Sequence, residues 1–319
     1  MTMIQRAPDC IYGDTSSTKT SRLGDAAEYY YEKTGNPSRL VCTDNAGWGP
    51  LDSLVSRGII QPYKVVPGRK HLIQDLSRLT QGGWPKDPSD PLSEIVFGPL
   101  DEVGAIFFDG ITTTCQLMME VHQGSITVQG GTMSATNIRV PEMPRDSYIQ
   151  SGDYARRFVG RSDYMGVQDR IQEFVRNTSM LPVPVIWTAL EAKGEDADRK
   201  PIYGPQFIGK ALTGVCGPWF GNLIHLDFVN KLTKVTDPDD PKVSFEVEQP
   251  TPYMFLKPHF DPKDPMKVKY PAKVRAPRTL HEKVPAFAKP RLDLLYKFLD
   301  ELREQEIAEA TLATTGASK

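Results

Sequence analysis

The sequence predicts an α/β fold with a mostly parallel sheet and helices on both faces. Three observations lead to this fold class. Short apolar runs that are typical of buried strands alternate along the chain with segments rich in helix-forming residues. Several of these runs end in polar residues, which parallel strands would bring together at one edge of the sheet. A loop of small residues after the first run leads directly into a helix.

The alternation of strands and helices can be followed from the N-terminus to residue 229. Strands are expected at residues 10–12, 39–44, 59–66, 105–109, 183–189 and 223–229. Helices are expected at residues 20–33, 51–57, 71–79, 112–121, 164–177 and 206–215. The intervening segments 123–144 and 191–205 are expected to be loops, because the first has no clear periodicity and the second is highly charged.

The character of the sequence changes after residue 235, which divides a core (1–235) from a C-terminal extension (236–319). Residues 243–247 and 253–256 are expected to pair as a hairpin. Segment 257–291 is proline-rich and has ten Lys/Arg against three Asp/Glu, a net charge of +7. Leucines at helical spacing over 290–310 predict an amphipathic helix that packs on its own core or on a neighbouring subunit. A disordered tail is expected after it.

The composition is that of a soluble globular protein, with 39% hydrophobic and 24% charged residues. A net charge of −2 gives no overall attraction to nucleic acid or to a membrane surface, and no apolar run is long enough for a transmembrane helix. The four cysteines are far apart, which favours buried free thiols in a reducing cytosol. The five histidines are scattered along the chain and predict no metal site.

Residues 13–20 match the phosphate-binding loop G-x-x-x-x-G-K-[ST], with Thr18 in place of the second glycine. In this motif backbone N–H groups and the positive end of a helix dipole surround a phosphate. Lys19 would bind the β- and γ-phosphates, and the Thr20 hydroxyl would ligate Mg²⁺. The residues expected to contact the nucleotide are Gly13, Asp14, Thr15, Ser16, Ser17, Thr18, Lys19 and Thr20. The alternative is an ordinary turn rich in Gly, Ser and Thr.

Asp44, Asp109 and Thr188 each lie at or near the carboxyl end of an expected strand. Asp109 would hold Mg²⁺ opposite Thr20, or would only cap the following helix. Asp44 would act as the base that orients the attacking water, or would form a turn with Asn45. Thr188 would sense the γ-phosphate, or is simply a β-branched strand residue. Their convergence at one sheet edge favours the nucleotide site over the turn.

Four segments carry a resemblance to a known family: Gly13-x₄-Thr18-Lys19-Thr20, Phe107-Phe108-Asp109, residues 185–189 and residues 203–211. Together they resemble the RecA-like branch of the P-loop NTPases, over about residues 9–229. More narrowly, they are similar to the AAA-type ATP-binding proteins of tailed bacteriophages, some of which resemble single-strand recombinases.

The resemblance implies a RecA-like core that binds ATP and Mg²⁺ through Lys19, Thr20 and Asp109, with Asp44 as the base. Two positions depart from the family pattern. Thr18 restricts the backbone where glycine is expected, so ATP binding or turnover is expected to be impaired. Gly110 stands where other ATPase branches have a glutamate after the metal-binding aspartate.

The resemblance implies a phage-type ATPase, with a degenerate Walker A loop, that couples nucleotide binding to DNA handling as a homo-oligomer. Segment 257–291 would contact single-stranded DNA through its positive charge and through Phe260, Tyr270 and Phe287. Its alternative is a proline-rich strap across the core. The alternative function is a structural or assembly protein of a phage particle with little or no ATP hydrolysis. A nucleotide kinase is disfavoured, because no Arg-rich lid helix is visible. These functions place the protein in the host cytoplasm or on the virion, without a membrane.

Overall fold

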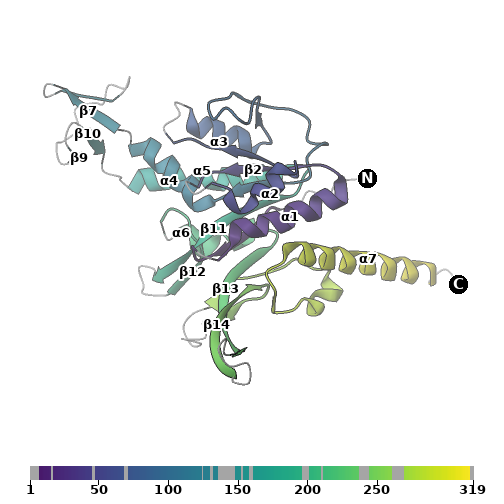
Figure 1. Cartoon of the computed structure of the whole chain (residues 1–319). Coiled ribbons are helices and arrows are strands. Elements are labelled where there is room, and N and C mark those ends of the chain that lie inside the picture. Colours follow the sequence, from purple (N-terminus) through teal and green to yellow (C-terminus); the bar gives the residue numbers. More distant parts are fainter. Residues whose placement is uncertain are drawn as a thin grey trace.

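The computed structural model describes residues 7–15, 17–44, 47–67, 71–123, 125–129, 132–135, 148–151, 154–157, 161–195, 201–209, 211–236, 244–260 and 269–316. Within these residues the main sheet has nine strands, eight of them in the order β17-β14-β13-β1-β11-β6-β2-β3, with β12 pairing with β11. Figure 1 shows this sheet with helices packed on both sides of it.

The strands at the centre of the main sheet are parallel, as the sequence predicts. They are β1 (Asp9–Gly13), β2 (Ser38–Cys42), β3 (Ile60–Lys64), β6 (Ile106–Asp109), β11 (Val185–Glu195) and β13 (Leu223–Thr236). Strand β1 lies between β11 and β13, so Cys10 is level with Trp187 on one side and with Leu223 on the other. All five residues of β1 are buried, because helices cover both faces of the sheet.

Alternate residues of the central strands pack into two hydrophobic cores on opposite faces. Cys10 and Tyr12 pack with the helices on one face, α3 (Leu72–Thr80), α4 (Ile111–Gln123) and α5 (Arg161–Ser179). Ile11 packs on the other face with α1 (Lys19–Thr34), α2 (Asp52–Ser56) and α7 (Leu292–Gly316). The short helices are α6 (Ala211–Val215) and the 3₁₀ turns Gly49–Leu51, Gly217–Trp219 and Arg278–Lys283. The α/β fold class is thus confirmed.

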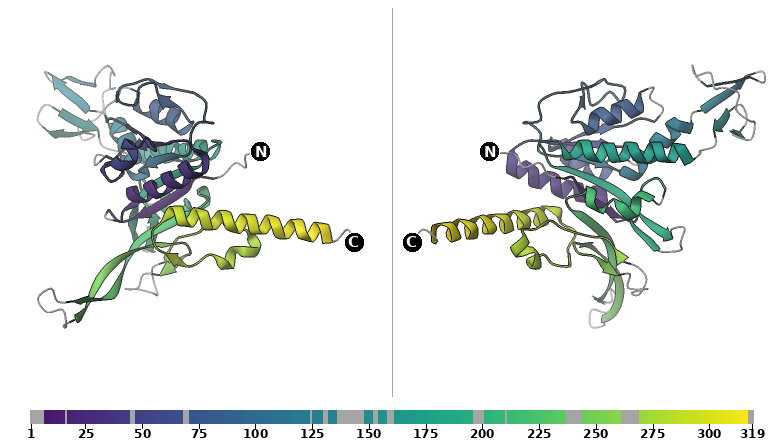
Figure 2. Two further views of the ribbon diagram at one scale, coloured as in Figure 1. Left: turned by 45° about the vertical axis from the view of Figure 1, so that its right-hand side comes forward. Right: turned by 180° about the vertical axis from the view of Figure 1, so that it is seen from behind.

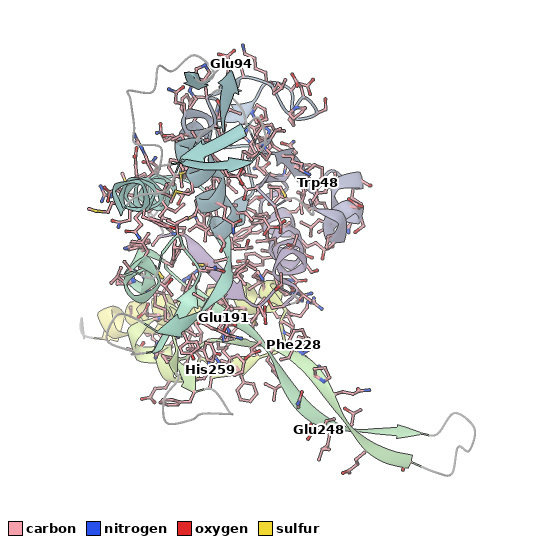
Figure 3. The ribbon with its side chains drawn as sticks, turned by 90° about the vertical axis from the view of Figure 1, so that its left-hand side faces the viewer. Trp48, Glu94, Glu191, Phe228, Glu248 and His259 are labelled. Atoms are coloured by element: carbon pink, nitrogen blue, oxygen red, sulfur yellow. The ribbon has the colours of Figure 1, made fainter. Side chains whose placement is uncertain are left out.

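Antiparallel strands extend this sheet where the sequence predicts loops or a separate hairpin. Strand β11 continues to Glu195 and pairs with β12 (Pro201–Pro205), so the expectation of a loop over 191–205 is wrong. Strand β14 (Ser244–Phe255) is continuous and pairs with β13 from Thr236 back to His225, and β17 (Phe287–Ala288) pairs with β14. The expected hairpin between 243–247 and 253–256 is therefore wrong. The far end of the β13–β14 pair projects as an arm, with Glu248 on it (Figure 3).

Three smaller sheets complete the described structure. They are β8-β7-β10-β9, with β7 (Ser125–Gln129), β8 (Thr132–Ala135), β9 (Tyr148–Ser151) and β10 (Tyr154–Arg157), then β4 (Trp84–Pro85) with β5 (Ile95–Val96), and β15 (His259–Phe260) with β16 (Lys269–Tyr270). Strands β7 and β8 correct the prediction of a loop over 123–144, of which residues 124, 130, 131 and 136–144 lie outside the described residues.

The C-terminal helix α7 packs on α1 of the same chain. Its buried residues belong to the same core as α1, and Tyr296 donates a hydrogen bond of 3.0 Å to the Asp9 carboxylate. The apolar stripe expected on this helix therefore lies on its own core. The later turns of α7 project beyond the rest of the molecule (Figure 2). The division at residue 235 stays a prediction. Among the described helices, none is at once long enough and apolar enough to span a membrane.

Candidate nucleotide-binding site

The loop between β1 and α1 is closely packed at its first residue. A Cβ atom on Gly13 would lie 2.4 Å from the Leu226 carbonyl oxygen and 2.6 Å from the Ser17 hydroxyl, so only glycine fits there. The Asp14 carbonyl accepts hydrogen bonds from the Ser17 backbone N–H (3.0 Å) and hydroxyl (2.7 Å). The Thr15 N–H and hydroxyl donate to the Asp14 carboxylate and lower its pKa. Ser16 lies outside the described residues.

Thr18 occupies the second glycine position of the motif in the conformation that glycine would adopt. Its φ of 61° and ψ of 22° are left-handed, and Thr18 is the only residue other than glycine with a positive φ in the described part of the chain. For a β-branched residue this conformation is strained. Thr18 therefore has a backbone conformation that glycine would adopt with less strain.

Lys19 is the first residue of α1, and its ammonium group lies inside the loop. It donates hydrogen bonds to the Gly13 carbonyl (3.0 Å), the Asp14 carbonyl (2.7 Å) and the Ser17 hydroxyl (3.2 Å). Burial lowers its pKa, and four nearby carboxylates oppose this effect. They belong to Asp109, Asp14, Asp44 and Glu191. Lys19 therefore lies close to several carboxylates, of which Asp44 and Asp109 line the same cavity.

Asp109, at the end of β6, is held between two threonine hydroxyls. Thr20 donates a hydrogen bond of 2.8 Å to one carboxylate oxygen, and Thr188 donates one of 2.5 Å to the other. Burial raises the pKa of Asp109, and these two hydrogen bonds partly offset that effect. The sequence places these three residues at different strand ends, and the structure brings them into direct contact.

A cavity of about 450 Å³ opens beside these groups. Its lining includes the predicted site residues Thr15, Thr18, Lys19, Thr20, Asp44, Asp109 and Thr188. Gly13, Asp14 and Ser17 form the turn of the loop behind Lys19. The volume is within the range of about 300–1,000 Å³ that is typical of small-molecule sites. The edge of the sheet therefore does gather the residues predicted there.

Sequence reasoning missed a group of threonines around the Asp109–Gly110 peptide. The Thr43 hydroxyl lies 2.9 Å from the Gly110 carbonyl oxygen and 2.7 Å from the Thr113 hydroxyl, and it accepts a hydrogen bond from the Gly110 N–H (3.0 Å). Thr112 and Thr113 also line the cavity. The signal for this group is the run of three threonines directly after Ile111.

The polar groups that line the cavity fit a nucleotide bound with Mg²⁺. The Thr20 hydroxyl and the Asp109 carboxylate are hard oxygen ligands of the kind that Mg²⁺ prefers, and Lys19 begins a helix whose N-terminus attracts phosphate. The carboxylates of Asp44 and Asp109, which both line the cavity, also favour a dication there.

The arrangement of the strands around the loop agrees with the RecA-like fold that the sequence resembles. The strands run in the order β1, β11, β6, β2 across this part of the sheet. Strand β1 leads into the loop, and β6 ends in Asp109. Neither a scan of protein-family models nor a search of curated proteins gives a match.

Among solved structures, the chain is similar to the flagellar accessory protein FlaH of Methanocaldococcus jannaschii, with 10% identity, a TM-score of 0.31, and coverage of 78% of this chain and 84% of that one. It is also similar to a KaiC-like protein of Pyrococcus horikoshii, with 12% identity, a TM-score of 0.33, and coverage of 79% and 85%.

Proposed function

We propose that this chain is a Mg²⁺-dependent ATP-binding protein that hydrolyses ATP. One observation carries the proposal: the Lys19 ammonium, the Thr20 hydroxyl and the Asp109 carboxylate line one cavity at the end of the parallel sheet. An isolated turn rich in Ser and Thr would not place a lysine, a hydroxyl and a buried acid from a distant strand around the same space.

Each of these residues has a role that follows from its position. Lys19 would exchange its hydrogen bonds to the Gly13 and Asp14 carbonyls for bonds to phosphate oxygens. Thr20 and Asp109 would hold Mg²⁺, which neutralises charge on the phosphate oxygens when bound. Thr188 orients the Asp109 carboxylate through its hydrogen bond. Asp44, which lines the same cavity, would accept a proton from the attacking water.

The binding step is tested with Lys19→Ala. The variant should lose measurable Mg–ATP binding in calorimetry, because it removes the ammonium group that pairs with the phosphates. The exposed Lys283 offers a matched control, and Lys283→Ala should bind like the wild type. Unchanged affinity in a folded Lys19→Ala protein would show that the loop does not bind phosphate.

The hydrolysis step is tested with Asp44→Asn. Loss of a general base lowers turnover by about 10²–10⁴-fold. The affinity for Mg–ATP should stay close to that of the wild type, because in this proposal Asp44 acts only as a base. Phosphate release as fast as in the wild type would remove Asp44 from the mechanism and leave ATP binding untouched.

We also infer that ATP binding serves DNA handling, as in the phage proteins that the sequence resembles. Its support is the local net charge of +7 over residues 257–291. Much of the described part of this segment is a strap on the core: Val274, Leu280 and Val284 are buried, and the Lys273 backbone pairs with that of Leu223. DNA contacts would therefore come from the side chains that this strap exposes, such as Arg275.

Salt dependence tests the DNA proposal. The affinity for single-stranded DNA should fall with a log–log slope of about −0.7 per phosphate contact. The triple variant with Lys267, Lys269 and Arg275 changed to Ser should flatten that slope by roughly two units, by the same rule. Mg–ATP binding should persist in it. A homo-oligomer belongs to the same proposal, and light scattering with and without Mg–ATP measures it.

Absence of DNA binding at low salt would overturn the DNA-handling proposal. If Mg–ATP still bound and phosphate release were slow, the result would favour the alternative, a structural or assembly protein of a phage particle. Binding to that particle's proteins would then be the next measurement.

A further inference from the structure

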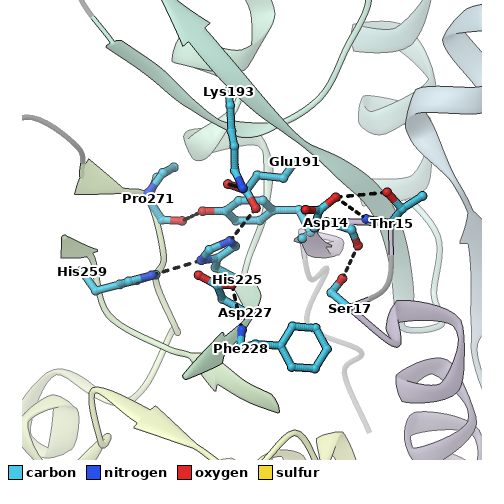
Figure 4. Close-up of polar contacts among 12 residues, drawn as sticks. Asp14, Thr15, Ser17, Glu191, Lys193, His225, Asp227, Phe228, His259 and Pro271 are labelled. Atoms are coloured by element: carbon cyan, nitrogen blue, oxygen red, sulfur yellow. Dashed lines mark hydrogen bonds and ion pairs between the residues drawn. The ribbon is translucent and has the colours of Figure 1, made fainter. Parts of the chain in front are cut away.

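His225 lies on β13 beside the loop, outside the nucleotide cavity, with its ring held on both faces. It is fully buried and stacks on Tyr12 (ring centroids 4.6 Å apart, planes at 24°) and on Tyr270 (4.5 Å, 15°). Tyr12 is itself fixed by its hydroxyl, which donates to the Pro271 carbonyl. Figure 4 shows the edge of the His225 ring pointing to Glu191 on one side and to His259 on the other.

Both ring nitrogens of His225 have a polar neighbour. Its Nε2 lies 3.2 Å from a carboxylate oxygen of Glu191, and its Nδ1 lies 3.1 Å from the Nε2 of His259. Asp227 follows two residues later on β13, so its side chain is on the same face of the strand. Its carboxylate is oriented by the Phe228 N–H, at 2.7 Å. Ligand atoms of His225, Asp227 and His259 all lie within 4.8 Å of one another.

We propose that His225, His259 and Asp227 form a binding site for a first-row transition-metal dication, with Zn²⁺ as the best-fitting ion. Two nitrogens bound to a tetrahedral zinc at about 2.0–2.1 Å are about 3.3 Å apart, close to the observed separation of Nδ1 and Nε2. Two imidazoles and one carboxylate are a ligand set that zinc uses when it keeps a fourth position for water. Asp227 and His259 are only partly buried, which gives that position access to solvent.

Glu191 supports this site from its outer side. A metal-binding histidine usually donates its second ring N–H to a carboxylate, which fixes the tautomer and strengthens the ligand. With Glu191 accepting from Nε2, the lone pair of His225 Nδ1 faces His259 and Asp227. A pair of hydrogen-bonded neutral histidines would account for the contact between them. It does not account for the carboxylate on each side of His225.

The site would join separate parts of the C-terminal half of the chain. His225 and Asp227 belong to the main sheet, and His259 belongs to β15, at the start of the basic segment. A bound metal would therefore tie β15 to β13. The sequence gives no signal for such a site, because His225 and His259 are 34 positions apart and meet only through the fold.

Zinc binding to the full chain is measured by competition with a chromophoric chelator. The wild type should bind one equivalent, and Asp227→Asn and His259→Gln should each weaken the affinity by more than tenfold. Glu191→Gln should weaken it by about 10–100-fold, the usual effect of losing such an outer carboxylate. His281→Gln, at an exposed histidine, is the matched control and should bind like the wild type. Bound Co²⁺ should give the intense visible absorption of a tetrahedral site.

Thermal unfolding in the presence of a chelator shows whether each variant is folded. If His259→Gln does not fold, Asp227→Asn still tests the proposal. No zinc binding by the wild type would overturn the proposal. Equal affinity in the wild type, Asp227→Asn and His259→Gln would also overturn it, because zinc would then bind elsewhere. Since Lys19→Ala leaves these ligands in place, loss of ATP binding in that variant should leave zinc binding unchanged.

Discussion

Thr18 combines a glycine-like backbone with a β-branched side chain, which makes it a point of strain in the loop. A left-handed conformation costs an L-residue about 1–2 kcal/mol, and a change to glycine removes this strain. Glycine also makes the unfolded chain more flexible, which offsets about 0.5–1 kcal/mol of the gain. Thr18→Gly should therefore stabilise the protein by about 1 kcal/mol or less, measured by denaturant unfolding. Thr18→Ala keeps a Cβ atom and should bring little of this gain.

The same conformation changes what Thr18 is expected to do to binding. Since the Thr18 backbone already has a left-handed conformation that glycine readily adopts, Thr18→Gly should alter Mg–ATP affinity only slightly. A large gain in affinity would mean that the Thr18 side chain blocks the cavity. A loss of stability in Thr18→Gly would mean that the side chain makes contacts that outweigh the strain.

The buried carboxylate of Asp109 should destabilise the folded protein at neutral pH. Its pKa is raised in the folded state, so the folded protein binds this proton more tightly than the unfolded chain does. The penalty is present when Asp109 is ionised and disappears as the pH falls through its folded pKa. Each tenfold change in proton affinity corresponds to about 1.4 kcal/mol.

Asp109→Asn should therefore raise the free energy of unfolding at pH 7 in the presence of EDTA, and this gain should fade as the pH falls toward 4. It should also abolish Mg²⁺-dependent ATP binding. Asp101→Asn, at an exposed aspartate, is the control for both measurements. A gain that persisted at low pH could not come from removal of a buried charge.

The residues of the nucleotide site were predictable where a local motif or the end of an apolar strand marks them in the sequence. Lys19 and Thr20 are marked by their spacing from Gly13, and Asp109 by the apolar run before it. The cluster of Glu191, His225 and His259 has no such signal. Its members come from β11, β13 and β15, which do not pair with one another and are brought together only by the fold.

At the scale of elements, α7 gives the sharpest test of packing. Leu299 is fully buried against the core that includes α1, while Ile307, two turns later, is 66% exposed. Leu299→Ala should cost about 2–5 kcal/mol of unfolding free energy, the range for a buried leucine. Ile307→Ala should change it by no more than about 0.5 kcal/mol. Similar losses in both would mean that the projecting turns of α7 are also covered in solution.

The central strands and most helices were predictable because burial on both faces leaves continuous apolar runs, as in β6. The antiparallel strands that extend the sheet were not predictable in this way. Strand β11 runs past Leu190 into charged residues, because its outer half pairs with β12 at the surface, and β14 contains two prolines within its length. Their pairing depends on the neighbouring strand rather than on their own hydrophobic pattern.

At the scale of the whole molecule, ligand binding should appear as a change in global stability. A ligand that binds only the folded state at 100 times its dissociation constant adds about 2.7 kcal/mol. For a chain of this size that corresponds to a rise in Tm of roughly 5 °C. Both cores pack against the strand that leads into the loop, since Ile11 belongs to one and Tyr12 to the other. We therefore expect one shifted unfolding transition.

This rise should depend on Mg²⁺, because the carboxylates of Asp44 and Asp109 line the same cavity as Lys19. Free ATP adds further negative charge to this site, so ATP with EDTA should shift Tm much less than Mg–ATP does. His259→Gln should retain the full Mg–ATP shift, since its side chain lies outside the cavity. Lys19→Ala should lose it. An equal shift with and without Mg²⁺ would show that Thr20 and Asp109 do not hold the metal, and that the phosphates are bound by Lys19 and the loop alone.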